Sequence, residues 1–134
     1  MAEATICREI LISTPDRVGL LAEISQLIAA QTINILAVCV RVAQGEAQIR
    51  VVTDAPTYTL DALRKAEFSV DERDVVLVEL PHRPGLLRRV TDTLARQDLD
   101  IHDLYATVTS DSDQSLVVFS CSHNGKAVQL LRDR

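Results

Sequence analysis

The sequence predicts an α+β protein made of two tandem copies of one β-α-β-β-α-β unit. Residues 15–21 (Pro-Asp-Arg-Val-Gly-Leu-Leu) return 66 residues later as residues 81–87 (Pro-His-Arg-Pro-Gly-Leu-Leu). The same offset extends through the next helical pattern, where residues 33–35 (Ile-Asn-Ile) become residues 99–101 (Leu-Asp-Ile). A period close to half of the 134-residue chain indicates a duplicated domain.

Apolar periodicity predicts the elements of the first copy in order. Runs rich in β-branched residues predict strands, and apolar residues at helical spacing predict an amphipathic helix after Gly19. Gln44-Gly45-Glu46 predicts a hairpin turn, and Pro56 predicts a helix start, where a missing N–H is tolerated. The predicted strands are residues 5–14, 34–43, 47–53 and 68–70, and the predicted helices are residues 19–31 and 54–66.

The second copy repeats this pattern. Its first strand, residues 75–80, is a continuous apolar run, which is typical of a strand that is central in its sheet or covered on both faces. A helix is predicted at residues 85–97, a hairpin at 100–109 and 114–122, and a short helix after Asn124-Gly125. The sequence ends before a fourth strand, so the second copy is predicted to lack its last strand. Either its sheet edge is open, or it is filled by the long first strand, the other copy or another chain.

A β-α-β-β-α-β unit with right-handed crossovers folds as a four-stranded antiparallel sheet with both helices on one face, the ferredoxin-like sandwich. We therefore expect two domains, residues 1–72 and 73–134. Because units of about 65 residues are marginally stable alone, the copies are expected to share an interface and to pair again in a homodimer.

Charge and composition exclude several classes of protein. Residues 1–66 contain 6 basic and 7 acidic side chains, and residues 67–134 contain 8 and 12, so neither half has the basic surplus of nucleic-acid binding. The absence of a long apolar run and of a signal-peptide pattern predicts no membrane association and a cytoplasmic location. Cys7, Cys39 and Cys121 lack paired spacing, so reduced thiols are expected.

Motifs for catalysis and metal binding are missing from the sequence. There is no phosphate-binding loop, no nucleophile elbow and no dinucleotide fingerprint, so we predict no enzyme activity and no cofactor. His102 and His123 are predicted on one hairpin, near Cys121 or Asp103, but the close ligand spacing of a zinc site is absent. The prediction is therefore no catalytic residue and no metal site.

The combination of apolar strand, glycine loop, amphipathic helix and Ile-Asn-Ile strand start resembles the ACT domain family, in residues 5–70 and again in 74–131. ACT domains are small regulatory modules that bind amino acids and related metabolites. The resemblance implies a regulatory protein that senses an amino acid at the interface between ACT units and modulates a metabolic enzyme or transporter. The tandem arrangement is similar to paired ACT proteins without a catalytic domain and, distantly, to the regulatory subunit of acetolactate synthase.

Two glycines are the centre of the predicted ligand site. Gly19 and Gly85 each begin a helix, where first-turn N–H groups and the helix dipole attract a carboxylate. The resemblance implies that the backbone around Val18, Gly19 and Leu20 holds the carboxylate, and that Asn34 accepts a hydrogen bond from the ammonium group. Asp16 is a second candidate for the ammonium, because a charged acceptor makes a stronger bond.

The second copy keeps Gly85 and Leu86 but has His82 for Asp16, Pro84 for Val18 and Asp100 for Asn34. Asp100 remains an ammonium acceptor, whereas Pro84 removes an N–H donor, so the two loops need not bind alike. The full candidate set is Asp16, Arg17, Val18, Gly19, Leu20, Asn34, His82, Arg83, Gly85, Leu86 and Asp100.

Other interpretations of these residues and of the whole chain stay open at this point. The glycines and Asn34 could serve only as turn or cap residues, and Arg17 and Arg83 could be solvated or paired with carboxylates. The protein could be a structural interaction module, or a regulatory subunit of a biosynthetic enzyme without a ligand of its own. A small enzyme or metal-dependent protein is the third class.

Overall fold

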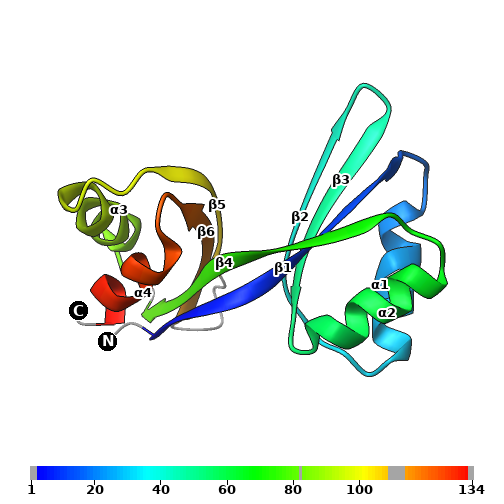
Figure 1. Cartoon of the computed structure of the whole chain (residues 1–134), viewed down its shortest axis with the longest axis horizontal. Coiled ribbons are helices and arrows are strands. Elements are labelled where there is room, and N and C mark those ends of the chain that lie inside the picture. Colours follow the sequence, from blue (N-terminus) through cyan, green and yellow to red (C-terminus); the bar gives the residue numbers. More distant parts are fainter. Residues whose placement is uncertain (1–2, 82, 109–113, 133–134) are drawn as a thin grey trace. The chain divides into compact units, whose positions relative to one another are not determined.

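The computed structural model describes residues 3–81, 83–108 and 114–132, and contains ten elements (Figure 1). They are β1 (Glu3–Pro15), α1 (Leu20–Ala30), β2 (Ile35–Ala43), β3 (Glu46–Thr53), α2 (Pro56–Lys65), β4 (Val70–Pro81), α3 (Leu86–Arg96), β5 (Ile101–Val108), β6 (Gln114–Cys121) and α4 (Asn124–Arg132). This order confirms the predicted α+β class and its ferredoxin-like repeats. The predicted turn at 110–113 lies outside the described residues.

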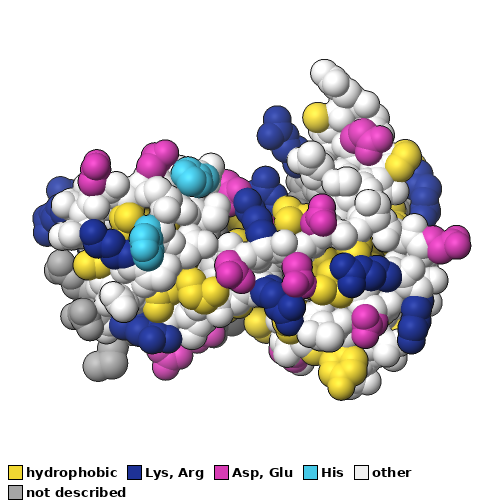
Figure 2. All heavy atoms as spheres, viewed as in Figure 1, with side chains coloured by type: hydrophobic (Ala, Val, Ile, Leu, Met, Phe, Trp, Pro, Cys, Tyr) yellow, Lys and Arg dark blue, Asp and Glu magenta, His cyan; other side chains and the backbone are white. Residues whose placement is uncertain are grey.

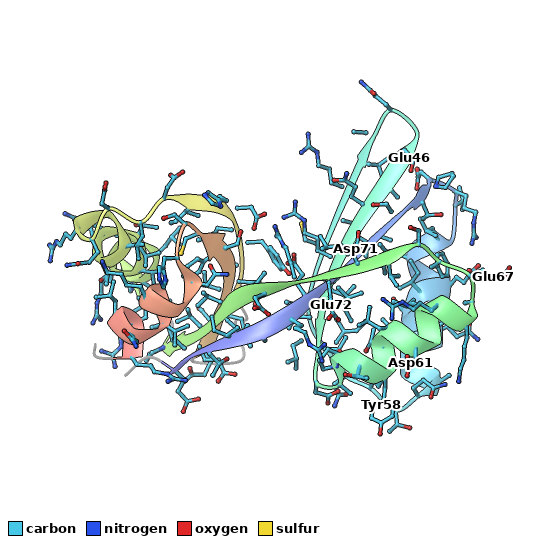
Figure 3. All side chains as sticks on the ribbon, viewed as in Figure 1. Glu46, Tyr58, Asp61, Glu67, Asp71 and Glu72 are labelled. Carbon is cyan, nitrogen blue, oxygen red and sulfur yellow. The ribbon has the colours of Figure 1, made fainter. Side chains whose placement is uncertain are left out.

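Strand β4 begins at Val70, the last residue of the predicted strand 68–70, and continues through all of the predicted strand 75–80, so the predicted separation of the two was wrong. The residues between them include neither Gly nor Pro, the residues that most often interrupt a strand. Two ion pairs also hold this stretch to β1. Arg8 Nη1 lies 3.0 Å from Oε1 of Glu72, which is labelled in Figure 3, and Arg73 Nε lies 2.8 Å from Oε1 of the fully buried Glu9.

The chain divides into two compact units. Arg8–Arg73 form the first-repeat unit, and Met1–Cys7 together with Asp74–Arg134 form the second-repeat unit. The chain therefore passes between units twice, once within β1 and once within β4. Compared with the expected domains 1–72 and 73–134, residues 1–7 belong with the second repeat rather than the first.

The sheet order is β2-β3-β1-β4-β6-β5. Its paired strands β1 and β3, β2 and β3, β4 and β6, and β5 and β6 are antiparallel. The duplication is visible in backbone irregularities as well, since the register shifts between Ile35 and Ala37 on β2 and between Ile101 and Asp103 on β5. These positions are related by the 66-residue offset, so both repeats have the same bulge.

In the first-repeat unit, α1 contacts α2, and the two helices lie next to each other in Figure 1. The α1 residues Ile24 and Ile28 are completely buried together with Ile12 on β1, Ile49 on β3 and Leu63 on α2. Helical spacing of the apolar residues on α1 thus produces the buried face that the sequence predicts.

The second-repeat unit obtains its fourth strand position from the beginning of β1. Ala4 is only 1% exposed and belongs to the same core as Val76 on β4 and Phe119 on β6. Arg132 Nε on α4 donates a hydrogen bond of 2.8 Å to the Ala4 carbonyl oxygen. Among the described residues no strand follows α4, and β1 is the neighbour of β4 in the sheet. The long first strand therefore occupies the edge that the second repeat leaves open.

Replacing Ala4 by Asp is expected to destabilise the second-repeat unit by at least about 2 kcal/mol, because a carboxylate would be buried in an apolar core. Hydrogen exchange measured by mass spectrometry should become faster in β4, β6 and α4, with much smaller changes in β2, β3 and α1. Thr5→Asp, at the exposed neighbouring position, is the control and should leave exchange unchanged. Equal effects of the two substitutions would contradict the assignment.

Candidate functional site

The loop between β1 and α1 presents an uncapped helix N-terminus. Gly19 has φ of 86° and ψ of 1°, a left-handed conformation, and no side chain caps α1. The Glu23 N–H donates to the Gly19 carbonyl oxygen at 3.0 Å. The N–H groups of Leu21 and Ala22 have no acceptor within the described part of the chain. Together with the helix dipole, these donors can bind an anion.

The predicted contact residues of this loop have different surroundings. Leu20 is 4% exposed and packs in the first-repeat core, so only its backbone faces the loop. Val18 is fully exposed. Arg17 Nη2 lies 2.8 Å from Glu23 Oε1, so its charge is already paired with a carboxylate on α1.

Asn34 lies at the opposite end of the first-repeat unit. The Asp16 N–H donates to the Gly45 carbonyl oxygen at 2.8 Å, which places the loop beside the β2–β3 turn. The Asn34 backbone N–H and Nδ2 donate to Asp54 Oδ1 and Oδ2 at 3.0 and 2.9 Å, at the far ends of β2 and β3. The intervening α1 is about 16 Å long at 1.5 Å per residue. A small ligand cannot contact Gly19 and Asn34 of the same unit.

The second repeat has the same backbone arrangement. Gly85 has φ of 85° and ψ of 4°, and the Arg89 N–H donates to its carbonyl oxygen at 3.0 Å. The Asp100 N–H donates to Ser122 Oγ at 3.1 Å, and the Ser122 N–H to the Asp100 carbonyl oxygen at 2.9 Å, matching the contacts of the Asn34 region. The remaining candidate of this loop, His82, lies outside the described residues.

A cavity of about 240 Å³ opens in the second-repeat unit, among the end of β4, the following loop, α3 and α4. Two predicted residues, Arg83 and Leu86, line it. Its apolar lining residues are Leu80, Pro81, Pro84, Leu86, Val90 and Leu131, and its polar lining residues are Arg83, Arg89, Asp92, Thr93 and Arg96.

Sequence reasoning missed the α3 residues of this cavity. Aligning the repeats at the 66-residue offset could have found them, because the second copy has a basic or polar residue at three positions where the first copy has a different type. Arg89 is equivalent to Glu23, Thr93 to Leu27, and Arg96 to Ala30.

The cavity is basic although the chain is acidic overall, with a net charge of −5. The guanidinium groups of Arg83, Arg89 and Arg96 make no hydrogen bond or ion pair with any described residue. Asp92 Oδ2 lies 3.5 Å from Nε of Arg88, which does not line the cavity. Elsewhere, basic and acidic side chains are interspersed on the face shown in Figure 2.

The other predicted chemistry can be compared with the described residues only. They contain no group of three or more His, Cys, Asp or Glu side chains that could hold a metal ion. His123 Nδ1 accepts a hydrogen bond of 3.1 Å from the Lys126 N–H at the start of α4. None of the helices in the described ranges is long and apolar enough to cross a membrane.

Comparison with known proteins supports the fold. No protein-family profile and no curated protein matches the chain. Protein BT0572 from Bacteroides thetaiotaomicron matches with a TM-score of 0.87 and 24% identity over 98% of this chain and 90% of that one. The ligand-free regulatory subunit of aspartate kinase from Thermus thermophilus matches with a TM-score of 0.72 and 18% identity, over 98% and 95%. The structure of the aspartokinase alpha and beta subunits matches with a TM-score of 0.69 and 18% identity, over 97% of this chain and 95% of that one. At these identities the matches show an ACT-like fold and nothing finer.

Substituting Ala for Gly19 or Gly85 is expected to lower the free energy of unfolding by about 1–2 kcal/mol, because a Cβ is unfavourable in the left-handed region. No atom lies within 4 Å of an added Cβ at either position, so the effect comes from backbone strain rather than from a clash.

The measurement is urea unfolding. Gly125→Ala in α4 is the matched control, since its φ is not positive and the added Cβ would meet His123 at an ordinary 3.7 Å. It should leave stability unchanged or raise it by up to about 1 kcal/mol. If all three glycine substitutions lowered the free energy of unfolding equally, Gly19 and Gly85 would have no special conformational role.

Proposed function

We propose that this protein is a regulatory protein without catalytic activity that binds a small amino acid and modulates a metabolic enzyme or transporter. The observation that carries the proposal is the uncapped N-terminus of α1 behind Gly19, in a fold that also occurs in regulatory subunits of aspartate kinase. Function belongs to the site rather than to the fold, so the chemistry of this loop is the main support.

The loop suits the carboxylate of an amino acid. The N–H groups of Leu21 and Ala22 are available as donors, and the helix dipole favours a negative charge there. The space above Gly19 is open, so a ligand can approach the backbone closely. The ammonium group requires an acceptor, and Oδ1 of Asn34 is one, because Asp54 bonds to the N–H groups and the backbone carbonyl oxygen of Asn34 and not to Oδ1.

A second copy of the chain would supply Asn34. Strand β2 is at one end of the sheet order, and four of its apolar side chains, at every second position from Leu36 to Val42, are 40–50% exposed. An unprotected apolar edge strand favours pairing with another strand. If two copies paired their β2 strands antiparallel about a twofold axis, Asn34 of one copy would lie at the β2–β3 turn of its partner, the end where the Gly19 loop lies.

Such a site links ligand binding to regulation, because the amino acid would contact both copies and so stabilise one arrangement of the homodimer. A ligand of about 10 non-hydrogen atoms at about 0.5 kcal/mol per atom gains about 5 kcal/mol. This corresponds to a Kd from high micromolar to millimolar, a range suited to sensing a metabolite pool.

Binding is tested by thermal shift and isothermal titration with each of the twenty amino acids. One amino acid or a small related group should raise Tm, with stabilisation of about 2.7 kcal/mol at one hundred times its Kd. Asn34→Ala should weaken binding at least about tenfold.

Asp54→Ala is the control for Asn34→Ala, because it also removes the hydrogen bond from Asn34 Nδ2, together with that from the Asn34 backbone N–H, but leaves Asn34 Oδ1 in place. It should lower stability while largely keeping affinity. Equal loss of binding in both variants would assign Asn34 a structural role. No response to any amino acid would favour the alternative of a structural interaction module, for which the exposed β2 edge is the supporting observation.

Replacing Val40, in the middle of the exposed β2 edge, by Lys is expected to convert the dimer to a monomer, because a charged residue on an edge strand opposes pairing with another strand. Analytical ultracentrifugation measures the change in mass. Ala106→Lys, at the equivalent exposed position of β5, is the control and should leave the dimer intact. A monomeric wild-type protein at micromolar concentration would contradict this arrangement.

A further inference from the structure

The cavity of the second-repeat unit is large enough for a small metabolite. Its volume of about 240 Å³ equals the liquid volume of about eight water molecules. Its walls are largely apolar and come from β4, the following loop, α3 and α4 of one unit. It is thus a site within one unit, separate from the first-repeat loop.

The repeat comparison explains why the cavity exists. In the first repeat, Leu27 packs against the buried core, whereas the equivalent residue on α3 is Thr93. Ile24, completely buried on α1, is replaced by the smaller Val90. Thr93 Oγ1 donates a hydrogen bond of 2.7 Å to the Arg89 carbonyl oxygen, so its hydroxyl is satisfied within α3. The second repeat has lost side-chain volume at the position where the cavity lies.

The same comparison explains its charge. In the first repeat, Arg17 is paired with Glu23 at 2.8 Å. In the second repeat, Arg89 replaces that glutamate, so Arg83, the equivalent of Arg17, loses its partner. Arg96 adds a third cation two turns further along α3, at the i, i+7 spacing from Arg89 that places both residues on the same face of the helix. Substitution in one repeat has therefore collected unpaired arginines around a new cavity.

We propose that this cavity binds a small organic acid, a carboxylate carried on a short aliphatic body. Arginine guanidinium groups bind carboxylates through paired, charge-assisted hydrogen bonds, and the apolar walls would enclose the aliphatic part. Among the described lining residues, three arginines outnumber one carboxylate, Asp92, which is itself close to Arg88. An ammonium group is therefore disfavoured, so the ligand differs in class from the amino acid proposed for the first-repeat loop.

The first test compares two probes of one shape, 4-methylpentanoate and the neutral 4-methylpentanamide, by titration followed with NMR at about physiological salt. The carboxylate should bind saturably and shift signals of α3 and the preceding loop, with an affinity at least about tenfold above that of the amide. Equal binding of the two probes, or no saturable binding of the carboxylate at millimolar concentration, would overturn the proposal.

The second test restores the first-repeat residues. Arg89→Glu should pair Arg83 as Glu23 pairs Arg17, and Thr93→Leu should fill the cavity; each is expected to weaken 4-methylpentanoate binding at least about tenfold. Lys126→Glu makes the same charge change at an exposed residue of α4 that does not line the cavity, and it should weaken binding less than about threefold, because exposed charges away from the site are screened.

Two readouts keep these results interpretable. Far-UV circular dichroism and Tm report whether each variant is folded. Because Arg89 is exposed, Arg89→Glu still tests the proposal if Thr93→Leu disturbs packing of the core. Asn34→Ala should leave 4-methylpentanoate binding unchanged, which separates this cavity from the amino-acid site. Loss of carboxylate binding in Lys126→Glu equal to that in Arg89→Glu would indicate a general charge effect and contradict a built site.

Discussion

The fold depends on two strands, β1 and β4, that each belong to both compact units. The second repeat has no described strand after α4, and residues 3–7 of β1 take the fourth position, with Ala4 buried in the core of that unit. The first-repeat unit holds the start of β4 through the ion pairs of Arg8 with Glu72 and of Glu9 with Arg73. Because Glu9 is fully buried, removing Arg73 would take a cationic partner away from a buried carboxyl group, which is destabilising.

On this scaffold, duplication preserved the backbone and changed the side chains. Gly19 and Gly85 have φ of 86° and 85°, and β2 and β5 have their register shift at the same position. Left-handed backbone and bulges tolerate few residue types, whereas exposed helix positions tolerate many. The α1 and α3 faces could therefore diverge in charge and volume while the fold was kept.

The two loops consequently offer different chemistry to ligands. In the first, the positive charge of Arg17 is cancelled by Glu23, and neutral backbone donors dominate. In the second, unpaired arginines surround an apolar cavity. The same fold occurs in solved structures at 18–24% identity, because core patterns accept many apolar combinations. Similarity of fold therefore does not determine the chemistry that each loop offers.

The sequence by itself determined the two repeats, the element order, the buried faces of the helices and the glycines that open them, because periodicity and backbone preference are local properties. Only the tertiary structure decided that β4 is continuous, that residues 3–7 complete the second repeat, and that Asn34 lies about one helix length from Gly19. It also revealed the cavity beside Arg89. These features depend on which distant segments meet and on the space that side chains leave unfilled. The order of residues along the sequence shows neither of these directly.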